Sequence, residues 1–310
     1  MSSLKLGTRG SALALWQANW TKAELEKRWP GLTIDLILIK TSGDKILDVP
    51  LARIGGKGLF TKEIDHALLD GRIDLAVHSL KDVPFQLPDG IDIVAIPERE
   101  DPRDAFVSNG PKLQDLTSGA LVGTSSLRRQ VQLRHRFPFL SLASLRGNVD
   151  TRLRKLAAGE FDAIILAAAG LKRLGYPDRI TQFLDEDIMI SAVGQGALAI
   201  VCRSGDSSTS EMVQVLNHTP TRTAVTAERG LLRALGGSCQ VPIAGKANVQ
   251  QQRLTIKGLI ASVDGTQVIR EELSGSADQP TELGLELGRR MLSRGAAEIL
   301  AEISRYGTEG

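Results

Sequence analysis

Short apolar runs alternate with longer amphipathic segments through the first two-thirds of this 310-residue chain. Apolar runs of four to eight residues are typical of strands, and apolar positions three or four residues apart are typical of helices. The pattern predicts strands at 4–7, 33–39, 74–78 and 91–96, separated by helices at 11–29 and 57–70. This alternation favours a mostly parallel sheet with helices on both faces.

The same pattern begins again after the polar segment 101–104, where we expect a hinge. It predicts strands at 120–123, 140–145 and 161–167, with helices at 126–136, 149–158 and 168–174. Both series open with a Gly-Thr pair at a strand end and a serine that caps a helix. We therefore expect two similar α/β lobes that face each other across a cleft. A later strand at 197–202 permits a return to the first lobe, which would make that lobe discontinuous.

The last third has a different character. A helix at 221–235 precedes strands at 241–247, 254–263 and 268–273, and a helix follows at 283–303. Asp264-Gly265 predicts a hairpin turn between the second and third strands. This segment reads as a small α+β domain with an antiparallel sheet. The expected domains are 1–98 with 197–216, 102–193, and 219–310.

Composition narrows the class of protein. With 42% hydrophobic and 24% charged residues, the chain is expected to be an ordinary soluble globular protein. Two cysteines make no disulfide framework, no apolar run reaches the roughly 18 residues of a membrane helix, and the N-terminus lacks a signal-peptide pattern. We therefore expect a cytoplasmic protein, and its modest net charge of +2 is compatible with a monomer.

Positive charge is concentrated in one stretch. Between Thr124 and Lys155 there are seven arginines, one lysine and one histidine against a single acid, Asp150. Three strand-to-helix junctions bring hydroxyl groups and arginines together, and such junctions bind anions at helix N-termini. The usual alternative for an arginine is a solvated helix face, and phosphate and polycarboxylate ligands fit equally well. The candidate anion-binding residues are Arg9, Ser11, Thr124, Ser126, Arg128, Arg129, Arg146, Arg152 and Arg173.

Two further segments could carry chemistry. In 77–84, a partly desolvated Asp82 could stabilise a developing cation or move a proton, although loop aspartates more often cap or turn. His78 in the same segment is expected to be structural, because its strand neighbours are apolar. The second is a glycine-rich flap that could close over a ligand and comprises Gly55, Gly56, Lys57, Gly58 and Phe60. The histidines and cysteines do not fall at metal-ligand spacings.

Cys239 follows two glycines that end a helical run. A thiol held at the tip of a tight loop is a candidate nucleophile or attachment point. The alternative is a small buried hydrophobe, the common state of a free cysteine and the one we expect for Cys202.

Eight segments together resemble the porphobilinogen deaminase (hydroxymethylbilane synthase) family, in order and over nearly the whole chain. They are LGTRGS (6–11), GGKGLF (55–60), AVHSLKDVP (76–84), EDPRDAF (100–106), VGTSSLRR (122–129), SLRGNV (144–149), AVGQGA (192–197) and the Cys239 segment (228–244). The one variation is Ser238, where some members have glycine, and a small residue is kept.

The resemblance implies two lobes like those of periplasmic binding proteins and a third domain that carries a dipyrromethane cofactor. Cys239 would hold this cofactor through a thioether, and Asp82 would be the catalytic residue beside the pyrrole nitrogens. The enzyme would polymerise porphobilinogen head to tail with loss of ammonia and release hydroxymethylbilane for tetrapyrrole biosynthesis. The carboxylate-binding residues would be Arg9, Ser11, Lys57, Ser79, Lys81, Thr124, Ser126, Arg128, Arg129, Arg146, Arg152 and Arg173.

Two other functions fit part of the pattern. An anion-binding protein without catalysis explains the arginines but not the cysteine loop. A nucleic-acid binder explains the basic stretch but lacks stacking aromatic residues, since only Phe137 and Phe139 lie there. The expected partner is therefore the small molecule porphobilinogen, with no nucleic acid, membrane or metal.

Overall fold

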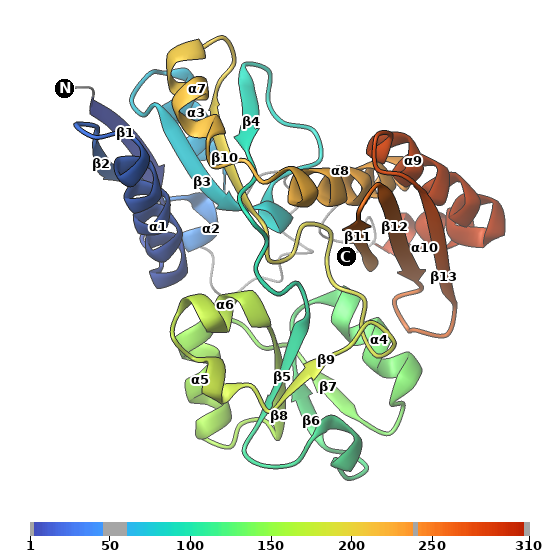
Figure 1. The fold of residues 1–310 in the computed structure, drawn as a ribbon. Coiled ribbons are helices and arrows are strands. Elements are labelled where there is room, and N and C mark those ends of the chain that lie inside the picture. The colour runs from blue at the N-terminus through green and yellow to red at the C-terminus, as the bar shows by residue number, and fades with distance from the viewer. Residues whose placement is uncertain (1–2, 46–60, 238–240, 307–310) are drawn as a thin grey trace. The chain divides into compact units, whose positions relative to one another are not determined.

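The computed structural model describes residues 3–45, 61–237 and 241–306 (Figure 1). These residues divide into two compact units. The first contains 3–45, 61–100 and 197–222, and the second contains 101–196, 223–237 and 241–306. Among the helices in these ranges, none is long and apolar enough to cross a membrane.

A five-stranded sheet forms the centre of the first unit, in the order β2-β1-β3-β10-β4. Its strands are β1 (Ser3–Thr8), β2 (Thr33–Leu38), β3 (Leu75–Ser79), β4 (Ile91–Ala95) and β10 (Leu198–Arg203). β1 pairs in parallel with β2 and β3, whereas β10 pairs antiparallel with β3 and β4. Four strands therefore run in one direction, and only β10 is reversed.

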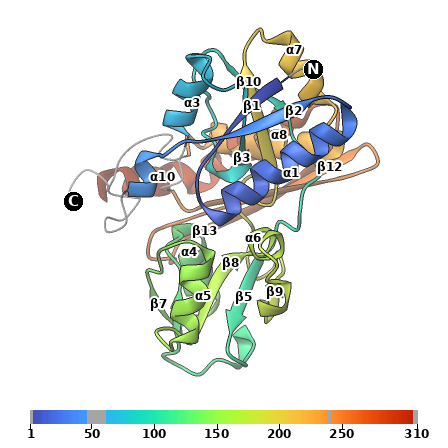
Figure 2. The same cartoon turned by 90° about the vertical axis from the view of Figure 1, so that its left-hand side faces the viewer.

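Helices cover both faces of this sheet, and Figure 2 shows the opening β1–α1–β2 segment in blue. The helices are α1 (Ala12–Arg28), α2 (Ser42–Lys45), α3 (Lys62–Leu69) and α7 (Ser207–Gln214). Leu75 and Val77 of β3 pack with α1 and α7, while Ala76 between them packs with α3. The two-residue period of the strand thus divides the core into two layers.

The second unit begins with a sheet of the same design, in the order β7-β6-β8-β5-β9. Its strands are β5 (Asp104–Ser108), β6 (Leu121–Gly123), β7 (Ser141–Ala143), β8 (Ala163–Ala167) and β9 (Gln182–Leu184). Here β5 is the reversed strand, antiparallel to β8 and β9. In each lobe the reversed strand is the one that the chain enters from the other lobe, because β5 follows β4 and β10 follows β9.

Three helices surround this second sheet, α4 (Leu127–Arg136), α5 (Val149–Ala157) and α6 (Ala168–Arg173). Leu133 of α4 packs on one face, with Phe106 and Val122. Leu156 of α5 and Leu171 of α6 pack on the other, and Figure 1 shows these helices on opposite sides of the sheet.

The C-terminal part of the second unit is an antiparallel sheet with helices. Its elements are α8 (Thr219–Ala234), β11 (Ile243–Gln250), β12 (Arg253–Ala261), β13 (Val268–Ser276), α9 (Pro280–Met291) and α10 (Ala297–Tyr306). Of these helices, α8 begins in the first unit and continues into the second. Helices α8 and α9 pack on one face of the sheet, where Leu231 and Leu287 join its core. The opposite face packs against α4 of the second lobe, through Leu259 and Val131.

The predicted fold class, two α/β lobes and a C-terminal α+β domain, is confirmed. Four strands and α-helices were missed, namely β5, β9, α2 and α7. The single helix predicted at 283–303 is wrong, because Gly295 adopts φ +107° and separates α9 from α10. The predicted helix at 57–70 is observed from Lys62 to Leu69, and its first residues lie outside the described ranges. The predicted domain limits stay a prediction.

Candidate functional site

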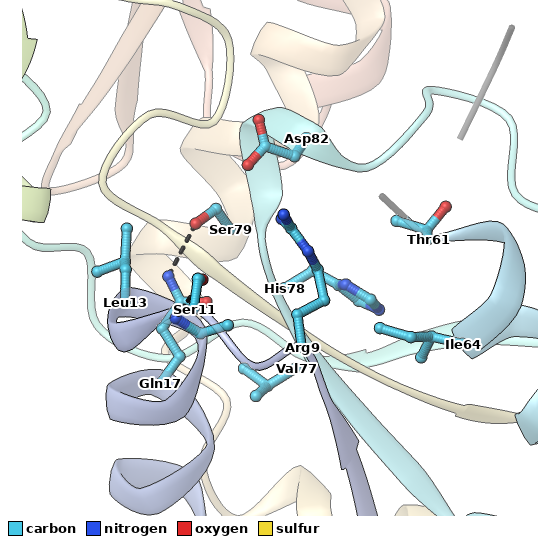
Figure 3. Close-up of a pocket in the computed structure, with 11 residues that line it drawn as sticks. Arg9, Ser11, Leu13, Gln17, Thr61, Ile64, Val77, His78, Ser79 and Asp82 are labelled. Carbon is cyan, nitrogen blue, oxygen red and sulfur yellow. Dashed lines mark hydrogen bonds between the residues drawn. The ribbon is translucent and has the colours of Figure 1, made fainter. Parts of the chain in front are cut away.

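The carboxyl end of β1 forms the base of a pocket in the first unit. Ser11 caps α1, and its Oγ accepts a hydrogen bond from the backbone N–H of Ala14 at 3.3 Å. The Thr8 hydroxyl donates to the Ala14 carbonyl oxygen at 3.2 Å and ties the strand end to the same helical turn. Arg9, between these two anchors, extends from the pocket base toward Asp82 (Figure 3).

The next strand end carries Asp82. A single helical turn, Leu80–Asp82, follows β3 directly, and Leu80 is buried and donates its N–H to the Ala197 carbonyl at 3.0 Å. With the backbone fixed there, Lys81 is partly exposed and Asp82 is exposed at the pocket wall. The expected partial desolvation of Asp82 is therefore wrong, because the anchored turn projects its carboxylate outward.

Gln17 is a pocket residue that the sequence did not reveal. It is only 3% exposed, and its Nε2 donates to the Ser79 Oγ at 2.8 Å (Figure 3). Ser79 is thereby an acceptor toward Gln17, so its own O–H can donate to a ligand. A polar residue on the buried stripe of the helix at 11–29 was the available signal.

His78 also lines this pocket, rather than serving only as a core residue. Burial, and then the charge of Arg9, lower its pKa to about 4. The pocket thus brings together a neutral imidazole, a guanidinium and a carboxylate, with the hydroxyls of Ser11 and Ser79 beside them (Figure 3). Such a set can bind an anionic arm and stabilise a cation close to it.

In the second unit, the β6–α4 junction carries four predicted site residues. Thr124 is buried, and its Oγ1 accepts from the backbone N–H of Ser126 at 3.3 Å at the start of α4. Arg128 and Arg129 are each 5% exposed, and both bond to Asp104, with shortest distances of 2.7 Å. The strand-end location was predicted, but the pairing of both guanidiniums with one carboxylate was not.

Asp104, the first residue of β5, is fully buried. Gln195 adds a third side chain, with its Nε2 3.0 Å from Oδ1. Burial disfavours the charged carboxylate, but Arg128 and Arg129 outweigh this and hold the pKa of Asp104 well below its usual range. A single acid therefore neutralises part of a concentrated positive region.

Arg146 and Arg152 lie at the next junction, before and within α5. Gly147, at φ +106°, makes the turn, and Arg152 Nε donates to its carbonyl at 2.9 Å. Burial, and then the charges of Arg129 and Arg146, lower the pKa of Arg152 to about 10. Guanidiniums close enough to repel one another favour a ligand with several negative charges. Arg173 donates to the Gly196 carbonyl at 2.8 Å.

Six predicted site residues lie outside the described ranges, namely Gly55, Gly56, Lys57, Gly58, Phe60 and Cys239. Cys202 is buried, as expected, and burial raises the pKa of its thiol to about 12. Among the described residues, no three His, Cys, Asp or Glu side chains cluster in a way that could hold a metal ion.

Sequence families match almost all of this chain. Residues 4–211 match the family described as "Porphobilinogen deaminase, dipyromethane cofactor binding domain", and residues 222–293 match "Porphobilinogen deaminase, C-terminal domain". The first match alone spans the two lobes that carry the pocket and the arginine cluster.

Relatives with the name porphobilinogen deaminase are similar over nearly their full length. The protein of Geobacter sulfurreducens is 54% identical over 303 residues, which cover 98% of this chain and 95% of that protein. The protein of Trichlorobacter lovleyi is 55% identical over 300 residues, covering 97% and 96%. The protein of Pelobacter propionicus is also 55% identical, covering 97% of each chain.

Among solved structures, the methionine binding protein MetQ matches with a TM-score of 0.45 and 13% identity, covering 69% of this chain and 89% of that one. The substrate binding domain of a putative molybdenum ABC transporter from Clostridium difficile matches with a TM-score of 0.43 and 11% identity, covering 70% and 93%.

Proposed function

Because this chain belongs to the porphobilinogen deaminase family, we propose that its pocket around Asp82 is where porphobilinogen units are joined head to tail. Each addition releases ammonia, and the transferase finally releases hydroxymethylbilane for tetrapyrrole biosynthesis. The observation that carries the residue assignment is the pocket itself, which places Asp82 beside the donors Arg9, Ser11 and Ser79.

Substrate binding rests on those donors. Each porphobilinogen carries an acetate and a propionate arm, and the Arg9 guanidinium is suited to a bidentate contact with one carboxylate. The Ser11 and Ser79 hydroxyls add donors at the same rim, and Gln17 fixes the orientation of Ser79. Lys81, next to Asp82, adds positive charge for the second arm.

Asp82 acts on the reacting pyrrole. As the bond between the aminomethyl carbon and nitrogen breaks, nitrogen leaves with the electron pair as ammonia, and positive charge develops on the substrate ring. A carboxylate placed beforehand stabilises such charge by several kcal/mol. The new carbon–carbon bond then leaves a surplus proton on a ring carbon, and Asp82 is positioned to accept it.

The arginines of the second unit fit a dipyrromethane. Its side-arm carboxylates would relieve the repulsion among Arg129, Arg146 and Arg152, which adds to the larger effect of burial in lowering the pKa of Arg152. When bound, this group supplies the pyrrole carbon at which the chain starts to grow. We assign Thr124, Ser126, Arg128 and Arg173 to the same set of carboxylate-binding residues.

Cys239 is proposed as the thioether anchor of the dipyrromethane, supported by its glycine frame and by the family resemblance. The glycine-rich segment with Lys57 and Phe60 is proposed as a flap over the substrate. A reducing cytoplasm suits a chain whose Cys239 thiol must stay free for this bond, and we propose a monomer. Size-exclusion chromatography with light scattering should give one chain of 33.4 kDa.

Intact mass and turnover together test this function. Protein from cells that supply porphobilinogen should carry an adduct of two pyrrole units, which Cys239→Ser should lack. Asp82→Asn should keep the adduct but lose turnover by roughly 100-fold or more, the scale of removing one preorganised electrostatic group. Asp89→Asn, an exposed acid seven positions away, is the matched control and should be as active as the unaltered protein.

Two results would contradict the proposal. An unmodified mass would favour an anion-binding protein without catalysis. Unchanged kinetics in Asp82→Asn would remove Asp82 from the reaction, even if the adduct is present.

A further inference from the structure

Two buried polar atoms of the pocket lining, Thr61 Oγ1 and His78 Nε2, have no hydrogen-bond partner among the described residues. His78 is 7% exposed, and within the described part of the chain its buried Nε2 meets no hydrogen-bond partner. Buried polar atoms in native proteins are almost always paired, so an unpaired one in a pocket wall points to a ligand. The apolar side chain of Ile64 lines the pocket beside the His78 ring (Figure 3).

The strand geometry makes this placement specific. Residues of β3 alternate between the faces of the sheet, so His78 shares the face of Ala76. Ala76 packs with Ile64 of α3 in the apolar layer. An apolar side chain at this position would avoid the free-energy cost of burying an unpaired polar atom. A histidine here therefore needs a function that packing alone does not supply.

The electrostatic environment of His78 indicates which charge the bound ligand group should have. Burial and the Arg9 charge hold the pKa of His78 at about 4, so its imidazole is neutral near pH 7 and offers one N–H. A positive potential at this ring repels an ammonium group and attracts a carboxylate. Ile64 provides apolar contact for the methylene carbons that precede such a carboxylate.

We propose that His78 is a substrate-binding residue whose Nε2–H donates a hydrogen bond to one side-arm carboxylate of the pyrrole, the carboxylate whose charge Arg9 balances. This rests on the proposed function, because it takes porphobilinogen as the substrate. The Arg9 guanidinium balances the charge of the carboxylate. The neutral imidazole contributes a directional hydrogen bond and adds no second positive charge. His78 thereby distinguishes the two arms of the ring, which differ in length by one methylene.

Two substitutions separate binding from packing. His78→Leu removes the donor and keeps an apolar wall, whereas His78→Gln carries an amide N–H near the position of Nε2. His78→Leu should raise KM for porphobilinogen by roughly 10- to 100-fold, the loss expected for a hydrogen bond to a charged group, with little change in kcat. His78→Gln should stay within a few-fold of the unaltered protein.

Thermal unfolding provides the structural readout. Because the described residues leave Nε2 unpaired, His78→Leu should leave Tm unchanged or raise it while KM rises. A fall in Tm with equal KM increases in both variants would show a packing role and overturn the proposal. An unchanged KM in His78→Leu would overturn it as well.

Altered substrates identify the arm. In porphobilinogens with either the acetate or the propionate converted to its neutral amide, one change should cost the unaltered protein affinity but cost His78→Leu little further. Additive losses for both arms would mean that His78 contacts neither.

Binding without turnover separates this inference from the proposed function. A pyrrole with both acid arms and a methyl in place of the aminomethyl group cannot react, and its affinity can be measured by calorimetry. Weaker binding to His78→Leu than to His78→Gln supports the hydrogen bond even if the protein releases no ammonia, and equal binding rejects it. Absence of ammonia release alone contradicts the proposed function.

Discussion

Asp104 is unusual because its single carboxylate pairs with several side chains. Its carboxylate is fully buried and accepts hydrogen bonds from Arg128, Arg129 and Gln195. Both guanidiniums are themselves almost completely buried, so water cannot replace the carboxylate. Removing one partner of a buried ion pair leaves an uncompensated charge, which costs far more than the pair contributes.

Asp104→Asn should therefore destabilise the protein by about 3–5 kcal/mol, measured by urea unfolding. Asp70→Asn is the matched control, because the Asp70–Arg72 pair is exposed and such pairs contribute about 0–1 kcal/mol. Equal stability of the two variants would contradict the assignment of a buried charge network.

Acid unfolding provides a second, independent test of this charge network. The folded-state pKa of Asp104 is depressed by its guanidinium partners, so its contribution is present above the unfolded value of about 3.9 and is lost as pH falls below it. This part of the acid dependence should be missing in Asp104→Asn.

Residue identities were easier to find from the sequence than residue environments. Arg9, Ser11, Ser79 and Asp82 lie at strand ends, and the structure collects them in one pocket. The environment of Arg128 could not be predicted, because its partner Asp104 lies 24 residues earlier, in a polar segment that was predicted to be a hinge.

Among the elements, α8 and α9 depend on glycine for their close approach. A Cβ at Gly284 would lie 2.0 Å from the backbone oxygen of Ala227, and one at Gly230 would lie 2.7 Å from that of Thr281. Backbone atoms cannot move aside as a flexible side-chain end can. The glycines therefore set the distance between the two helices.

Gly284→Ala should destabilise the protein by about 3 kcal/mol or more, despite the higher helix propensity of alanine, because overpacking forces the helices apart. Thermal or urea unfolding measures this. Gly10→Ala is the control, since a Cβ there meets nothing within 4 Å, and it should change stability by less than about 1 kcal/mol. A neutral Gly284→Ala would mean that the helices separate at little cost.

The missed elements were not predicted because tertiary contacts stabilise them, rather than local sequence patterns. β5 begins with a charged residue whose burial only its distant arginines permit, β9 has three residues, and the sequence of α7, SSTSEMVQ, is largely polar. Local patterns do not contain the tertiary contacts that stabilise such segments. Gly295 could have signalled the break between α9 and α10, because a glycine in a helical run is a common end point.

At the scale of the whole molecule, the second lobe and the C-terminal domain share a core. Leu259 and Ala261 of β12 pack with Val131 of α4, and Glu186 contacts Lys246 at 2.6 Å and Lys257 at 2.7 Å. These contacts explain why the second lobe and the C-terminal domain fall into one compact unit.

Leu259→Ala should therefore destabilise α4 of the second lobe as well as the sheet that contains Leu259. The cavity should cost about 2–5 kcal/mol, and hydrogen exchange should accelerate in α4 as well as in β11, β12 and β13. The strands β1 and β3 should be unaffected. Leu38→Ala, at an exposed position, is the control. Faster exchange confined to the three C-terminal strands would show that the shared core does not couple the two parts.

The reversed strand β10 also bears on how the chain is made. It lies between β3 and β4, yet about 100 residues separate it from β4 in the sequence. At synthesis rates of roughly 5–20 residues per second, the facing edges of β3 and β4 remain unpaired for several seconds or more before β10 leaves the ribosome. Open strand edges invite pairing with other chains. The lobe that is translated first is thus completed only after the second lobe has been translated, and until then it depends on protection from aggregation.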